Sequence, residues 1–241
     1  MPNNLTINTL SVKSVIKYSL YLLIVTFALI SVDVLAHGVD DKTRAFLEQN
    51  TGIQFIPFLY IGAKHMITGY DHLLFLVGVI FFLYHSRDVL LYVTMFTIGH
   101  SVTLLFGVLS DIQVNVYLFD TIIGFSVVYK GFDNLGGFKR CFNRQPNTQW
   151  AVLIFGLFHG FGLATKLQEF QLPEDGLITN LIAFNLGVEL GQFAALAVIL
   201  IVINAWRKLP SFQRFSTLTN TALMSVGVML MGLQLTGYFT I

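Results

Sequence analysis

The stretch H-M-I-T-G-Y-D-H-L-L-F-L, residues 65–76, places two histidines and an aspartate at the start of a strongly apolar run. His65 and His72 are seven residues apart, which puts them on one face of an unbroken helix, two turns from each other. Gly69 allows the backbone to bend between them. Inside a bilayer, each ionisable group costs about 2.5 kcal/mol or more unless it has partners. A polar cluster here therefore indicates a functional site.

The composition surrounding this stretch is that of a membrane protein. The 241 residues are 55% hydrophobic and only 11% charged, with a mean hydropathy of +0.71, whereas soluble domains carry about 25% charged residues. Several apolar runs approach the length of about 20 residues that a helix needs to cross a bilayer. The net charge of +1 favours no nucleic-acid partner, and the single Cys141 excludes a multi-thiolate metal site within one chain. We therefore predict an all-α, polytopic membrane helix bundle surrounded by lipid.

The first 36 residues have the pattern of an export signal. Lys13 and Lys17 precede an apolar core at 18–30, and small residues precede a potential cleavage site after Ala36. The alternative is an uncleaved first helix. Cleavage and retention leave the predicted orientation of the later loops unchanged.

A short periplasmic segment, 37–54, is expected to precede a domain of six transmembrane helices, 55–241. The approximate spans are 56–84, 89–109, 114–131, 150–168, 177–205 and 216–240. The first is too long for one straight crossing of a core about 30 Å thick. With Pro57, Gly62 and Gly69 in its first half, it is predicted to be a short broken helix followed by a full span.

Basic residues concentrate in alternate loops, which the positive-inside rule places in the cytoplasm. They are Arg87, Lys130, Lys139, Arg140, Arg144, Arg207, Lys208 and Arg214. The other loops carry Asp111, Glu169, Glu174 and Asp175. We therefore expect a bacterial-type inner (plasma) membrane protein whose mature termini both face outward, into the periplasm.

Further polar residues lie inside three of the predicted spans. They are Thr97, His100 and Ser101 in the second span, His159 in the fourth, and Asn185, Glu189 and Gln192 in the fifth. Taken singly, each is explained by a hydrogen bond between helices. Four of the six histidines nevertheless fall inside the spans, and Asp71 and Glu189 add two carboxylates to the set. As a set they predict one shared functional site.

The chemistry of this set points to a metal ion. Imidazole suits zinc, copper, iron and nickel, while carboxylates favour harder cations. A mixed nitrogen and oxygen set without thiolates therefore predicts a divalent transition metal, Ni(II), Co(II) or Zn(II), as substrate or ligand. Permeation requires ligands that are weak or numerous enough to pass the ion on, and ligands spread over several helices and depths suit this requirement.

The motif His65-x3-Gly69-x-Asp71-His72, followed by Leu-Leu-Phe-Leu, resembles the signature of the HupE/UreJ family, regarded as nickel or cobalt permeases tied to hydrogenase and urease maturation. Similar blocks are F-T-I-G-H-S-V-T-L at 96–104, F-G-L-F-H-G-F-G at 155–162 and F-N-L-G-V-E-L-G-Q at 184–192. In the family the first motif often reads His-Pro, whereas Met66 follows His65 here, so the bend must come from Gly69 or Pro57. The resemblance implies that His65, Asp71 and His72 form the metal motif, and it points to partners in metallo-enzyme maturation.

These observations together predict a permease for a divalent, nickel- or cobalt-like metal. The capture group at the outer side comprises His65, Asp71 and His72. The mid-depth ligands are His100, His159 and Glu189, supported by Thr97, Ser101, Asn185 and Gln192.

Two alternatives remain open at this point. One is an intramembrane zinc-dependent hydrolase with Glu189 as general base, although no H-E-x-x-H motif is present. The other is a membrane scaffold. The pattern of residues in the sequence favours a transporter over an enzyme. It does not predict the oligomeric state.

Overall fold

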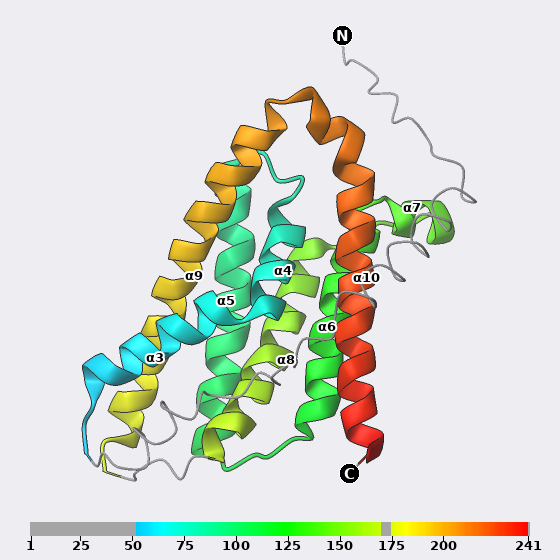
Figure 1. Cartoon of the computed structure of the whole chain (residues 1–241). Helices are drawn as coiled ribbons and strands as arrows, with labels where there is room; N and C mark the ends of the chain where they lie inside the picture. Colours follow the sequence, from blue (N-terminus) through cyan, green and yellow to red (C-terminus); the bar gives the residue numbers. More distant parts are fainter. Residues whose placement is uncertain (1–51, 170–174, 241) are drawn as a thin grey trace. The chain divides into compact units, whose positions relative to one another are not determined.

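The computed structural model describes residues 52–169 and 175–240 (Figure 1). The predicted signal, 1–36, and most of the predicted periplasmic segment lie outside the described residues. Within the described residues the secondary structure is helical and contains no strand, which confirms the all-α prediction for that part of the chain. The helices are α3 (Phe55–Thr68), α4 (Tyr70–Ile80), α5 (Ser86–Leu109), α6 (Val116–Asn134), α7 (Gly137–Phe142), α8 (Thr148–Gln168), α9 (Leu177–Arg207) and α10 (Pro210–Thr240).

Four of these helices, α5, α8, α9 and α10, are long and apolar enough to cross a membrane. Helix α6 has 19 residues but carries Asp120, Lys130 and Asp133, which lower its hydropathy. Helices α3 and α4 are shorter, with 14 and 11 residues. The structure thus supports several membrane crossings, and the count of six stays a prediction.

The first predicted span is broken at Gly69, as expected. Gly69 has an extended backbone (φ −72°, ψ 104°) between α3 and α4, and the two helices run in different directions (Figure 1). The expected full span after the break is wrong, because the 11 residues of α4 extend only about 16 Å at 1.5 Å per residue. The guanidinium of Arg207 donates to the carbonyl oxygens of Ile80 and Phe81, at 2.5 and 2.8 Å, and so caps the end of α4.

Three pairs of helices pack closely: α5 with α8, α3 with α9, and α6 with α10. Glycines form the contact surfaces. A Cβ built at Gly99 would lie 2.5 Å from the carbonyl oxygen of Leu153 on α8, and one built at Gly191 would lie 2.6 Å from that of Ala63 on α3. Real Cβ atoms do not come so close to backbone, so only glycine permits these approaches. Helix α4 contacts α6 and α9 and carries the central histidine of the site.

The long helices alternate in direction (Figure 1). The connection between α5 and α6, residues 110–115, lies at one end of the bundle, termed the α5–α6 end. The connection between α6 and α8, residues 135–147, lies at the other, termed the α6–α8 end. The loop charges predict that the α5–α6 end faces the periplasm.

Candidate metal-ion site

Three histidines from three other helices gather around His72 of α4. Its ring centroid lies 5.2 Å from that of His65 on α3, 4.9 Å from that of His159 on α8 and 6.2 Å from that of His100 on α5. His72, His100 and His159 are 4%, 1% and 1% exposed. The histidines that the sequence singled out on separate helices therefore converge, and they do so inside the bundle.

The break at Gly69 brings the two ends of the opening motif together. The chain turns between α3 and α4, so the ring of His65 packs edge-on against His72, with an interplanar angle of 77°. Met66, which stands where the family often has proline, is fully buried, and its Cβ lies 3.1 Å from a Cβ built at Gly191. Met66 thus packs α3 against α9, and the bend comes from Gly69.

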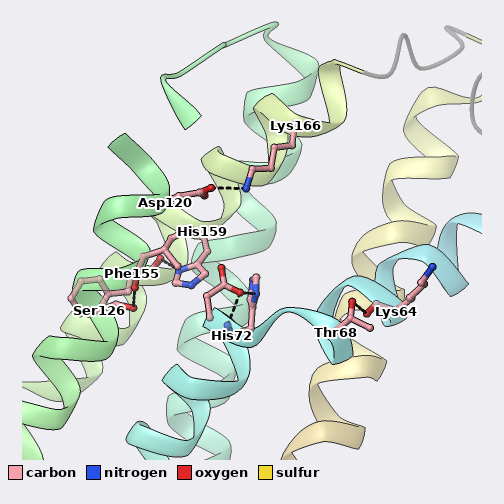
Figure 2. Close-up of polar contacts among 10 residues, drawn as sticks. Lys64, Thr68, His72, Asp120, Ser126, Phe155, His159 and Lys166 are labelled. Carbon is pink, nitrogen blue, oxygen red and sulfur yellow. Dashed lines mark hydrogen bonds and ion pairs between the residues drawn. The ribbon is translucent and has the colours of Figure 1, made fainter. Parts of the chain in front are cut away.

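Hydrogen bonds fix the rings of His72 and His159. The Nδ1 of His72 lies 2.8 Å from Oδ1 of Asp71, and the Nδ1 of His159 lies 2.7 Å from the carbonyl oxygen of Phe155 (Figure 2). A carbonyl oxygen and a carboxylate only accept, so each Nδ1 carries a proton, and in the neutral imidazole Nε2 is then the nitrogen with the lone pair. Both Nε2 atoms are buried and have no hydrogen-bond partner among the described residues.

His100 is the fourth histidine of the cluster, and its ring is held by stacking and not by a hydrogen bond among the described residues. Its ring stacks on Phe96 at 6.0 Å and 18°, and within the described part of the chain neither ring nitrogen has a hydrogen-bond partner. A buried polar atom without a partner costs about 1–3 kcal/mol. The cluster therefore holds several polar atoms at a cost that a purely structural core would avoid.

The spacing of the rings suits shared ligation of a cation. Two imidazoles that bind one ion at about 2.0–2.1 Å have ring centres roughly 5–6 Å apart, which is the spacing around His72. As they stand, no three His, Cys, Asp or Glu side chains in residues 52–169 and 175–240 form a group that holds a metal ion. Joint ligation by three of them requires side-chain movement.

The remaining predicted residues lie beside the cluster or apart from it. The hydroxyl of Thr97 donates to Oε1 of Gln192 at 2.9 Å and so joins α5 to α9. Asn185 donates to the carbonyl oxygen of Leu181 on its own helix. Ser101 follows His100 along α5, and its hydroxyl has no partner among the described residues. Their supporting roles stay predictions.

Glu189 is half-buried on α9, and no contact found among the described residues joins it to the histidines. The hydrolase alternative, which needs Glu189 as general base beside the metal, therefore gains no support. The role of Glu189 as a ligand stays a prediction.

The structure adds two residues that the sequence did not assign to the site. A small pocket is lined by His65, Asp71, His72, Asp120, Ile123, His159, Leu163 and Lys166. Asp120 of α6 and Lys166 of α8 form an ion pair of 2.8 Å at its edge (Figure 2). Lys166 follows His159 by seven residues, and this two-turn spacing was the available signal.

An aromatic layer closes the opposite side of the cluster. Phe75, Phe96 and Phe155 each lie within about a turn of a site histidine on its own helix, toward the α6–α8 end. The ring of Phe75 lies 5.6 Å from that of Phe96 and 5.8 Å from that of Phe155. The cluster is thus bounded by an ion pair on one side and by buried rings on the other.

Long apolar helices around a buried, histidine-rich polar site define a multi-pass membrane protein. The model of the HupE / UreJ protein family matches residues 41–241, so the chain belongs to this family. No curated protein and no solved structure shows significant similarity to the chain.

Proposed function

We propose that the protein is a permease for a divalent transition metal of the nickel or cobalt kind, and that the ion passes through the histidine cluster. The observation that carries the proposal is that the Nε2 atoms of His72 and His159 are buried and have no hydrogen-bond partner among the described residues. Each ring is oriented by a hydrogen bond at Nδ1, to a carboxylate in one case and to a carbonyl in the other. This is the usual support of metal-binding histidines. The association of the HupE/UreJ family with membrane transport of nickel and cobalt agrees with it.

The geometry favours a single ion-binding site over the two sites, outer and mid-depth, that the sequence suggested. His72 of the expected outer capture group lies 4.9 Å from His159 of the expected mid-depth group, measured between ring centroids. An ion that reaches Asp71 and His72 is therefore already beside His159 and His100. Ligands that approach in pairs from different helices exchange an ion more readily than one closed cage does.

The direction of passage follows from what bounds the cluster. The polar pocket lies toward the α5–α6 end, and the layer of Phe75, Phe96 and Phe155 lies toward the other end. The ion thus approaches from the α5–α6 end, predicted to be periplasmic. Its release to the opposite side requires the aromatic layer to open, since buried phenyl rings offer a cation no ligand oxygen or nitrogen.

Uptake of Ni²⁺ and Co²⁺ into proteoliposomes tests the proposal. We expect His72→Ala and His100→Ala each to reduce the initial rate about tenfold or more, because each removes a buried ligand nitrogen. His85→Ala is the matched control, since its side chain is 84% exposed on a loop, and it should transport as the wild type does. Wild-type accumulation by both cluster variants would refute the assignment.

A further inference from the structure

The Asp120–Lys166 ion pair joins α6 to α8 near the α5–α6 end. Its side chains are 11% and 16% exposed, and Nζ of Lys166 lies 2.8 Å from Oδ2 of Asp120. Taking two charges out of water is expensive, and an apolar pair of similar volume holds two helices together equally well or better. Packing alone therefore gives no reason for charges at this position.

The position of the pair supplies a reason. Lys166 and His159 lie on one face of α8, separated by seven residues or roughly 10 Å along the axis. Gly162 lies between them on that helix, and a Cβ built there would be 3.8 Å from Oδ1 of Asp120. The carboxylate of Asp120 thus reaches across to α8 between its ammonium partner and the histidines. The pair lines the same pocket as Asp71 and His72.

We propose that Asp120 is a further cation-binding carboxylate of this site and that Lys166 is a tethered cation which the transported metal displaces from it. The inference rests on the proposed permease function. An arriving divalent ion repels the ammonium and attracts the carboxylate. The flexible four-carbon stem of Lys166, two residues before the end of α8, allows the ammonium to swing toward the polar end of the helix. Asp120 then presents the ion to His159 and His72.

This arrangement selects by charge. A monovalent cation gains no more from Asp120 than the ammonium already supplies, and it must still displace a group that is held at the site. A divalent ion has about twice the Coulomb attraction for the same carboxylate at the same distance. The pair therefore admits divalent ions and rejects sodium and potassium before they reach the imidazoles.

The test is Ni²⁺ binding by purified full-length protein, followed by Ni²⁺ uptake with and without excess Na⁺. We expect Asp120→Asn to weaken Ni²⁺ binding about tenfold, as for loss of a charge-assisted contact in a partly buried site. Lys166→Met should tighten Ni²⁺ binding by about the same factor, because the competing cation is gone, and should make uptake sensitive to Na⁺. The double variant Asp120→Asn/Lys166→Met should bind as weakly as Asp120→Asn.

A pair that merely joined the helices would behave differently. Both single variants would then weaken binding together, and the double variant would recover wild-type affinity, so either result overturns the proposal. Lys166→Arg keeps the charge and the fold, and it should weaken Ni²⁺ binding, since a bidentate guanidinium is harder to displace from a carboxylate. Wild-type affinity in Lys166→Arg would also count against it.

Lys130→Met/Asp133→Asn is the control for loss of a buried pair away from the pocket, and it should leave Ni²⁺ affinity unchanged. The two proposals fail in distinguishable ways. Absence of Ni²⁺ and Co²⁺ uptake by the wild type, or uptake unchanged in both His72→Ala and His100→Ala, would refute the permease. Uptake that depends on His72 but not on Asp120 or Lys166 would refute only the tethered-cation role.

Discussion

Helix α6 carries two buried ion pairs, and their surroundings differ. Lys130 and Asp133 lie 2.6 Å apart on the same helix, with side chains 9% and 6% exposed. Asp133 also accepts hydrogen bonds from Gln145 and Thr148, so both its oxygens are occupied by groups near the α6–α8 end. The Asp120–Lys166 pair joins two helices and borders the pocket that holds the histidines.

Burial of charge does not by itself mark a functional site. Lys130–Asp133 is the more buried of the two pairs. Both carboxylate oxygens of Asp133 accept hydrogen bonds within a local network that joins α6 to the start of α8. Asp120 faces a pocket that contains a second carboxylate and three imidazoles. The neighbours of a buried charge, and whether they can bind the same ligand, decide what the charge does.

We expect the largest loss of stability from breaking the Lys130–Asp133 ion pair. Asp133→Asn leaves the ammonium of Lys130 buried without a counter-charge, which we expect to lower the free energy of unfolding by about 3 kcal/mol. Thermal unfolding of the purified protein measures this loss. The folded fraction should bind Ni²⁺ with unchanged affinity. A lower Ni²⁺ affinity in Asp133→Asn would contradict the view that only the Asp120–Lys166 pair acts on the bound metal.

A matched glycine pair on α8 gives the next largest effect. A Cβ at Gly160 would collide with the carbonyl oxygen of His100 and the hydroxyl of Thr103, whereas one at Gly162 has only ordinary contacts. Gly160→Ala should therefore destabilise the protein by about 1–3 kcal/mol and reduce Ni²⁺ uptake by moving His100 away from His159. Gly162→Ala should do neither. Equal behaviour of the two variants in thermal unfolding would contradict the close α5–α8 packing.

The smallest expected change in free energy concerns the histidine side of the pocket. Asp71→Asn replaces the carboxylate that accepts from Nδ1 of His72, and loss of such support lowers metal affinity about tenfold or more, or about 1.4 kcal/mol. Stability should change less than for Asp133→Asn, because the amide that replaces the carboxylate of Asp71 keeps an oxygen that can still accept from Nδ1 of His72. Calorimetric titration with Ni²⁺ checks this, and affinity equal to wild type would show that Asp71 does not orient the ligand.

The sequence predicted the helices of the described residues well. The second, third, fourth and fifth expected spans end within a few residues of α5, α6, α8 and α9, because hydropathy and helical period are properties of each segment alone. A break in the first span was also predicted, at Gly69 or Pro57, because glycine and proline disrupt a helix locally; the structure places it at Gly69. Helix α7 was missed, since six residues in a polar connection leave no hydropathy signal.

The sequence also determined the histidine set by itself. An imidazole inside an apolar run is costly wherever the helix packs, so His72, His100 and His159 could be singled out before any contact was known. Only the tertiary structure shows which polar side chains lie next to one another. Close approaches at glycines and the cap of Arg207 on α4 place the histidines in one cluster and bring Asp120 and Lys166 to it. These contacts join residues far apart in the chain, and no periodicity within one segment encodes its neighbours.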